Sequence, residues 1–144
     1  FWLKLFCAKC NLLLRVALAR RTRHRVSMGS LLSGPQDAGW QDLARAPNAL
    51  FVDVRTPGEF SQNSVHGSVN IPVRMGDDPV AALSTARAKG LLGEDGSRPI
   101  LVWCAAGGRA SRAAAGLRSL GFTNVKNGGG IDGVKAVLEG GSKQ

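Results

Sequence analysis

Residues 99–109 read PILVWCAAGGR and carry the strongest structural signal in the chain. Residues 99–103 form a continuous apolar run of strand length, and residues 110–120 are rich in helix formers and stop before Gly121. The pattern predicts a strand, a tight loop and a helix. Cys104 then lies at the carboxyl end of a central strand, where open α/β sheets place their ligands.

The predicted loop has a composition that favours anion binding. Gly107 and Gly108 let the backbone curl without a steric penalty, and a curled loop that enters a helix directs several N–H groups toward one point. The helix dipole and the guanidinium of Arg109 add positive potential there, which favours the thiolate form of Cys104. A cysteine at the end of a buried strand can also be an inert core residue. The neighbouring glycines and arginine favour a nucleophile instead.

The rest of the chain alternates short apolar runs with helical patterns. Further strands are predicted over residues 49–54, 68–72 and 122–126. Helices are predicted over residues 36–46, 57–62, 79–89 and 131–138, the second of them opened by a capping box from Thr56 to Glu59. Strands that alternate with helices indicate an α/β fold with a parallel sheet and helices on both faces.

Two further features are expected near the Cys104 loop. Asp53 and Arg55 end the strand over residues 49–54, and because they are two residues apart their side chains point to the same side. We expect an ion pair with a mainly structural role, in which Arg55 also adds positive potential. Residues 127–130, Asn-Gly-Gly-Gly, can bring backbone close to the loop.

Composition limits the domain count and the partners. At 144 residues with 44% hydrophobic residues, the chain is long enough for one domain with a core. Its net charge is +9, but residues 1–36 hold seven Lys and Arg and no acid, which leaves twelve basic against ten acidic residues in the remainder. That near balance argues against nucleic-acid binding by the folded part.

Residues 1–28 are interpreted as a separate basic extension. The segment is rich in arginine and lacks acids, which is typical of a mitochondrial or plastid transit peptide, and a non-native origin is the open alternative. The chain is otherwise expected in the cytoplasm and without a membrane span. Cys7 and Cys10 form a CxxC without the context of a redox or zinc motif. Residues 141–144 are expected to be a disordered tail.

Four motifs in order resemble the single-domain rhodaneses, a family of sulfurtransferases. They are residues 51–60 (FVDVRTPGEF), residues 65–72 (VHGSVNIP), the Cys104 loop and residues 128–130 (GGG). The resemblance implies a rhodanese domain over residues 29–140, with a parallel sheet of about five strands and helices on both faces. It also implies that Asp53 and Arg55 shape the wall of the active site.

The loop length separates two reactions of such cysteines. Four residues lie between Cys104 and Arg109, whereas the phosphatase signature has one more. In the family, the shorter loop accompanies sulfur transfer. The resemblance therefore implies that Cys104 takes a sulfane sulfur from an anionic donor such as thiosulfate and becomes a persulfide. The persulfide would be bound by the rest of the loop, Ala105, Ala106, Gly107, Gly108 and Arg109.

The expected acceptor is cyanide, glutathione or a protein dithiol, with no metal or organic cofactor and with the chain as a monomer or weak dimer. Two alternatives stay open. One is a persulfide carrier or sensor that serves a protein partner, which the apolar side chains of Ala105 and Ala106 favour. The other is a phosphatase-like or arsenate-reducing enzyme that uses the same cysteine.

Overall fold

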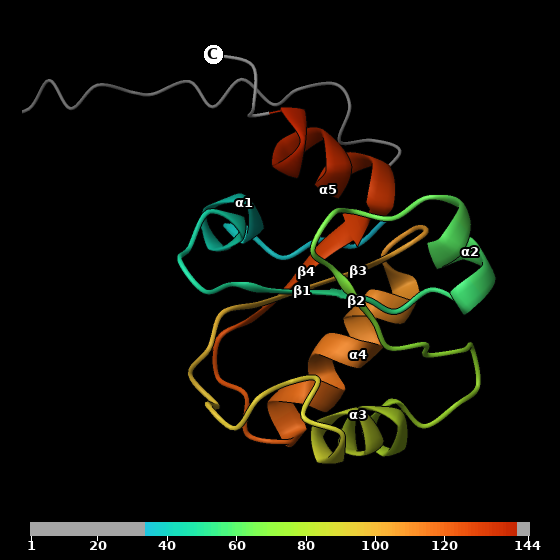
Figure 1. Cartoon of the computed structure of the whole chain (residues 1–144), viewed down its shortest axis with the longest axis vertical. Coiled ribbons are helices and arrows are strands. Elements are labelled where there is room, and N and C mark those ends of the chain that lie inside the picture. The colour runs from blue at the N-terminus through green and yellow to red at the C-terminus, as the bar shows by residue number, and fades with distance from the viewer. Residues whose placement is uncertain (1–33, 141–144) are drawn as a thin grey trace, which may run out of the picture.

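The computed structural model describes residues 34–140, which form a parallel sheet covered by helices (Figure 1). The strands are β1 (Leu50–Asp53), β2 (Val69–Asn70), β3 (Ile100–Cys104) and β4 (Val125–Gly130), in the spatial order β2-β1-β3-β4. The helices are α1 (Trp40–Ala44), α2 (Pro57–Gln62), α3 (Pro79–Ala88), α4 (Gly108–Ser119) and α5 (Ile131–Leu138). The predicted α/β class is confirmed, with four strands in the described residues where about five were expected.

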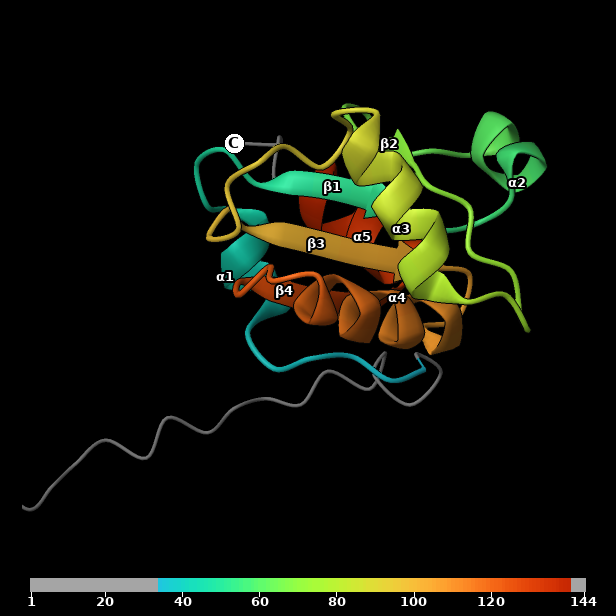
Figure 2. The ribbon, with the colours of Figure 1, turned by 90° about the horizontal axis from the view of Figure 1, so that it is seen from below.

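Helices cover both faces of this sheet. Helices α3 and α4 pack on one face, where Leu83 and Leu117 are fully buried, and α1 and α5 pack on the other around Trp40 and Val134 (Figure 2). Gly116 allows α3 and α4 to approach closely, because a methyl group at this position would lie 3.0 Å from the Leu83 side chain. The two layers enclose the sheet as the alternation of elements predicts.

Strand β3 lies between β1 and β4, and all of its residues are buried. Its side chains alternate between the layers: Val102 and Cys104 join the core under α3 and α4, whereas Leu101 and Trp103 join the core under α1 and α5. A strand buried on both faces needs the continuous apolar run that the sequence shows. The alternation also places Cys104 in the same layer as α4.

The prediction for the last strand is wrong in its boundaries. Strand β4 begins at Val125 instead of residue 122 and continues through the glycine run to Gly130. The pairing with β3 shifts there, so that Val102 faces Asn127 and Trp103 faces Gly129. A side chain at Gly128 would come within 2.8 Å of Val134, so glycine is required for this strand to pass under α5.

The helix predictions are mixed. The Thr56 to Glu59 capping box and the helix over residues 57–62 are confirmed, as is the final helix over residues 131–138. The helix predicted over residues 36–46 is shorter, because α1 spans only Trp40–Ala44. The chain before it runs along β4 instead, where the Asp37 N–H donates to the Asn127 carbonyl over 2.9 Å.

Some expectations fall beyond residues 34–140. The basic extension of residues 1–28 with its CxxC, and the tail of residues 141–144, lie outside the described residues. Within the described part, no helix has the length and apolar character needed to cross a membrane.

Candidate active site

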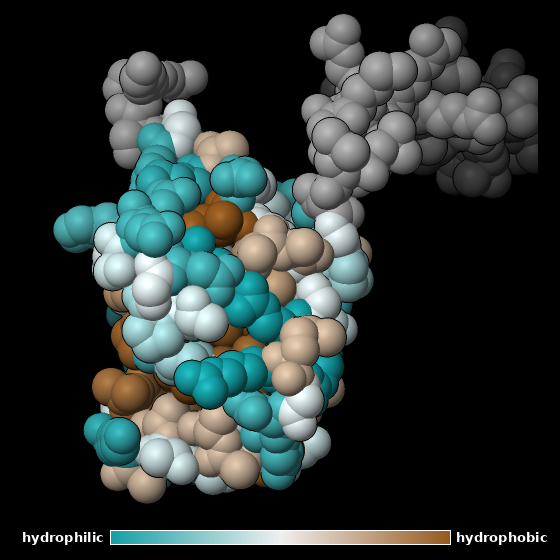
Figure 3. Space-filling view, turned by 90° about the vertical axis from the view of Figure 1, so that its right-hand side faces the viewer, coloured by the Kyte–Doolittle hydropathy of each residue, from teal (hydrophilic) through white to brown (hydrophobic). Residues whose placement is uncertain are grey.

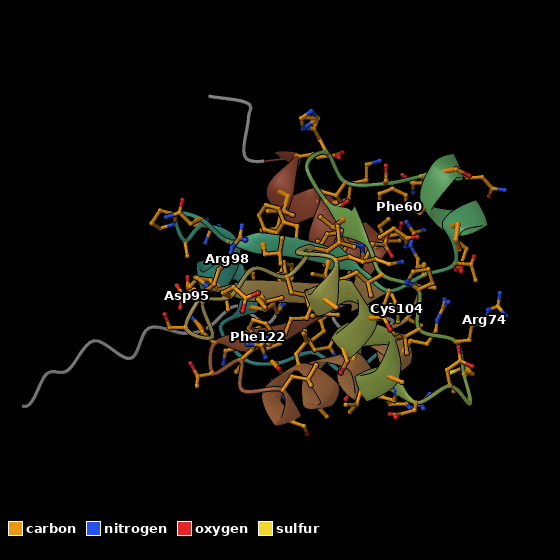
Figure 4. The ribbon with its side chains drawn as sticks, turned by 60° about the horizontal axis from the view of Figure 1, so that its bottom comes forward. Phe60, Arg74, Asp95, Arg98, Cys104 and Phe122 are labelled. Carbon is orange, nitrogen blue, oxygen red and sulfur yellow. The ribbon has the colours of Figure 1, made fainter. Side chains whose placement is uncertain are left out.

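Cys104 is the last residue of β3, and α4 begins at Gly108 after a loop of three residues. Figure 4 shows Cys104 at the carboxyl end of the sheet, with Phe60 and Arg74 at the same end and Asp95 and Arg98 at the opposite end. The predicted strand, loop and helix are therefore confirmed. The nucleophile candidate lies where parallel sheets commonly bind ligands.

A backbone amide contacts the Cys104 sulfur. The Gly107 N–H donates a hydrogen bond to Sγ over 3.0 Å. Gly107 has a φ of 91°, a left-handed conformation that directs its amide back toward the sulfur, and a Cβ there would lie 2.7 Å from the Pro35 carbonyl oxygen. Glycine is thus required at this position both by the conformation and by the neighbouring chain. The sequence predicted that several N–H groups point toward the cysteine. Among the described residues, one of them, that of Gly107, donates a hydrogen bond to Sγ.

The thiol lies beneath the surface of the loop. Cys104 is only 2% exposed and belongs to the core cluster that also contains Ala110. The loop residues Ala105 and Ala106, and Gly108 at the start of α4, are exposed. The Cys104 residue is therefore almost fully shielded from solvent. A sulfur atom added to Sγ would extend about 2 Å further from the cysteine.

The loop is held from behind by two backbone segments. A Cβ on Gly34 would clash with the Ala106 carbonyl oxygen at 1.7 Å, and one on Gly130 would lie 2.8 Å from the Ala105 carbonyl oxygen. These contacts confirm the expectation that the glycine run of β4 brings backbone close to the loop. The helix begins only at Trp40, after Asp37 has paired with Asn127 of β4 and Gly39 has adopted a φ of 73°.

Asn127 links the segment before α1, the Cys104 loop and the glycine run of β4 by hydrogen bonds. The sequence analysis did not predict this role. Its buried side chain donates to the carbonyl oxygens of Pro35, over 2.8 Å, and Gly107, over 3.2 Å. Its Oδ1 accepts from the Gly129 N–H over 2.8 Å. Asn127 therefore holds the carbonyl of Gly107, the residue whose N–H donates to Cys104. A polar residue before a glycine run was the only signal in the sequence.

Arg109 lies in the first turn of α4 and is paired with Glu59 of α2. Its two terminal nitrogens donate to the two carboxylate oxygens over 3.1 and 3.0 Å. These hydrogen bonds lower the pKa of Glu59 to about 2, with help from the Thr56 amide. The same contact raises the pKa of Arg109, and the Cys104 side chain acts in the same direction. The guanidinium is thus hydrogen-bonded to the Glu59 carboxylate, and the Cys104 side chain also favours its charged form.

Asp53 and Arg55 form the predicted ion pair. The Arg55 side chain donates two short bonds to Asp53 Oδ2, of 3.0 Å from Nε and 2.7 Å from Nη2, and both side chains are buried. The Asn70 side chain donates to the backbone carbonyls of both residues, and Arg55 also donates to the Asn63 carbonyl. Because Asp53 pairs with Trp103 across the sheet, the ion pair lies one residue from the level of Cys104.

Further arginines lie at the rim of this end of the molecule. Arg112, one turn after Arg109 in α4, donates to the carbonyls of Arg74 and Asp77 and so ties residues 74–77 to the helix. Arg74 itself is exposed. Figure 3 views the molecule from the side that carries α2 and shows hydrophilic side chains interspersed with smaller hydrophobic areas. Among residues 34–140, no group of three His, Cys, Asp or Glu residues is arranged to hold a metal ion.

The comparisons with known proteins agree with this geometry. The model of the rhodanese-like domain family matches residues 37–136. A thiosulfate:glutathione sulfurtransferase of Saccharomyces cerevisiae is 30% identical over 106 residues, which cover 69% of this chain and 76% of the relative. A thiosulfate sulfurtransferase of Escherichia coli is 30% identical over 81 residues, 56% of this chain and 69% of that protein.

Solved structures show the same architecture. A single-domain sulfurtransferase of Saccharomyces cerevisiae superimposes with a TM-score of 0.52 at 26% identity, covering 72% of this chain and 87% of that one. A rhodanese-like domain from Anabaena sp. gives a TM-score of 0.51 at 25% identity over 70% of this chain and 93% of its own. With the family model matched over most of the described residues, the chain belongs to the rhodanese-like domain family.

Proposed function

We propose that this protein transfers a sulfane sulfur from thiosulfate, or a similar donor, to a thiophilic acceptor through a persulfide on Cys104. The observation that carries the proposal is the position of the sulfur at the carboxyl end of β3, with the Gly107 N–H 3.0 Å away. The relatives named thiosulfate sulfurtransferases, at about 30% identity, support it.

The reaction has two halves. The Cys104 thiolate attacks the outer sulfur of thiosulfate, a new S–S bond forms, and the bond to the inner sulfur breaks. Sulfite leaves with the electron pair of that bond, so the total charge of three negative units is conserved. In the second half, cyanide or a thiolate attacks the outer sulfur of the persulfide, and the Cys104 thiolate is regenerated.

In both halves of the reaction, the loop stabilises negative charge on the sulfur atoms. Negative charge moves between Sγ and the added sulfur, and preorganised donors at that place lower the barrier. The Gly107 amide already contacts Sγ, and Arg109 lies close enough for Cys104 to affect its pKa. We expect the exposed backbone of Ala105, Ala106 and Gly108 to contact the outer sulfur once it is present.

Replacement of Cys104 by serine tests the proposal. The measurement is thiocyanate formed from thiosulfate and cyanide, and the expected result is loss to the background rate, because a serine hydroxyl is not a sulfur nucleophile. The variant should keep its far-ultraviolet circular dichroism, since serine is close in size to cysteine. Thiocyanate formation that persists in a folded Cys104→Ser protein would contradict the assignment.

A carrier that receives its sulfur from a protein partner is the second candidate. It is supported by the uncharged side chains of Ala105 and Ala106, which offer a small anion no charged side-chain contact. A phosphatase-like or arsenate-reducing activity has less support, because the loop between Cys104 and Arg109 is one residue shorter than the phosphatase signature. Persulfide formation from thiosulfate, mercaptopyruvate and a cysteine desulfurase, compared at equal concentration, distinguishes carrier from enzyme.

A further inference from the structure

The only cationic side chain in the loop from Cys104 to Arg109 is already engaged. Both terminal nitrogens of Arg109 donate to Glu59, and the Arg109 side chain is only 16% exposed. A two-pronged contact of this kind fixes the orientation of the guanidinium plane as well as its position. A donor that enters the site therefore meets an arginine whose charge is compensated.

Glu59 is itself held in place before any substrate binds. Its Oε2 accepts hydrogen bonds from the backbone N–H and the hydroxyl of Thr56, over 2.9 and 2.8 Å. These bonds belong to the capping box that starts α2. With a pKa of about 2, the carboxylate stays ionised at any pH at which the protein works. The negative charge near the loop is thus permanent and fixed.

Apart from the backbone amides, the ionised side chains next to the reacting sulfur carry more negative than positive charge. The Cys104 thiolate and Glu59 contribute two negative charges against the one positive charge of Arg109. Asp53 and Arg55 form a neutral pair. The rim arginines Arg74 and Arg112 also attract an anionic donor. Salt largely screens this attraction once the charges are more than about 10 Å apart. A doubly charged donor therefore meets more repulsion at the sulfur than a singly charged one.

We propose that Glu59 is a specificity-determining residue that makes the site select singly charged sulfane donors over the thiosulfate dianion. The proposal rests on the proposed sulfur transfer at Cys104 and names the class of donor that this site prefers. It follows from the fixed carboxylate at the loop arginine and from loop side chains that carry no other charge.

Two donors of nearly equal shape isolate the effect of charge. Methanethiosulfonate has a methyl group where thiosulfate has one oxygen, and it carries one negative charge instead of two. Attack by the Cys104 thiolate on its outer sulfur forms the same persulfide and releases methanesulfinate with the electron pair. The ratio of kcat/KM for thiosulfate to kcat/KM for methanethiosulfonate then measures how strongly the site discriminates against the second negative charge of the donor.

The test is Glu59→Gln, which keeps the shape and the capping bonds and removes the charge. We expect the ratio to rise by about fivefold, the size of one screened charge acting on one additional donor charge. The increase should shrink at high ionic strength. Glu94→Gln is the matched control, because it removes a carboxylate that is 87% exposed and directly precedes Asp95, which lies at the opposite end of the sheet (Figure 4), and its ratio should stay unchanged.

A second control separates charge from the capping role. Thr56→Ala removes the hydroxyl that donates to Glu59 but keeps the carboxylate charge and its bonds to Arg109, so its ratio should change much less than that of Glu59→Gln. Equal losses for both donors in Glu59→Gln, with the ratio constant, would show that Glu59 only orients Arg109 and would overturn the inference. If the wild-type protein forms no persulfide from either donor, the proposed function itself fails, which is a distinguishable result.

Discussion

Two arginine–carboxylate pairs lie at the carboxyl end of the sheet, and they differ in burial more than in geometry. Asp53–Arg55 is buried, with side chains 0% and 6% exposed, and Nη2 of Arg55 also donates to the Asn63 carbonyl. Glu59–Arg109 is also joined by two side-chain hydrogen bonds, but its side chains are 36% and 16% exposed and one of them belongs to the Cys104 loop. The sequence pattern of an acid and an arginine alone does not distinguish them.

The difference teaches that burial decides what such a pair contributes. A buried ion pair cannot exchange partners with a solute. Removing one of its members therefore lowers the stability of the fold. A pair open to solvent contributes little to stability and can respond to a charged ligand. Asp53–Arg55 therefore supports the strand end beside Cys104, whereas we propose that Glu59–Arg109 sets the electrostatics of sulfur transfer.

Asp53→Ala should have the largest effect. Removing one partner leaves the Arg55 charge buried without compensation, and we expect the free energy of unfolding to fall by about 3–5 kcal/mol. Urea denaturation measures it. Arg45→Ala is the control, because its pair with Asp42 is fully exposed and should contribute less than about 0.5 kcal/mol. A loss below about 1 kcal/mol for Asp53→Ala would remove the distinction between the pairs.

Arg109→Ala should act on activity instead. It removes the cation beside the sulfur and leaves Glu59 uncompensated, so kcat/KM for thiosulfate should fall by about 30-fold, the equivalent of about 2 kcal/mol. The free energy of unfolding should change by less than about 1 kcal/mol. Adding Glu59→Gln should restore part of the activity, which a double-mutant cycle would measure. An Arg109→Ala protein as active as the wild type would exclude electrostatic support by this residue.

The smallest effect should appear in the dependence of stability on pH. The pKa of Glu59 is lowered from 4.5 to about 2, so its pairing stabilises the fold above pH 4.5, and this contribution is lost as the pH falls through about 2. Because the pair is partly exposed, the contribution is about 1 kcal/mol. Urea denaturation of wild type and Glu59→Gln at several pH values should show a difference that narrows over this range. A difference that grows on acidification would have the wrong sign.

The sequence predicted those parts of the site that depend on neighbours in the chain. The apolar run before Cys104 and the glycines after it are local signals, and they placed the sulfur at the strand end correctly. The capping box that starts α2 was found for the same reason. Asp53 and Arg55 were expected to pair because residues two apart in a strand share a side.

Contacts between distant segments were not predictable in this way. Glu59 was identified only as a capping residue, because its contact with Arg109 spans 50 residues of sequence. The helix predicted over residues 36–46 did not take into account the hydrogen bond from the Asp37 N–H to the Asn127 carbonyl, which holds this segment along β4. The last strand was placed too early, since a run of three glycines has no strand propensity and is held in β4 by its pairing with β3.

The central claim is that the Cys104 sulfur accepts and holds a second sulfur. The most direct measurement is the mass of the Cys104 peptide after the purified protein has been incubated with thiosulfate and digested without reductant. We predict an increase by the mass of one sulfur atom that disappears on treatment with cyanide and is absent from Cys104→Ser. An unmodified Cys104 peptide, with the protein folded and thiosulfate and methanethiosulfonate both tried, would contradict the claim.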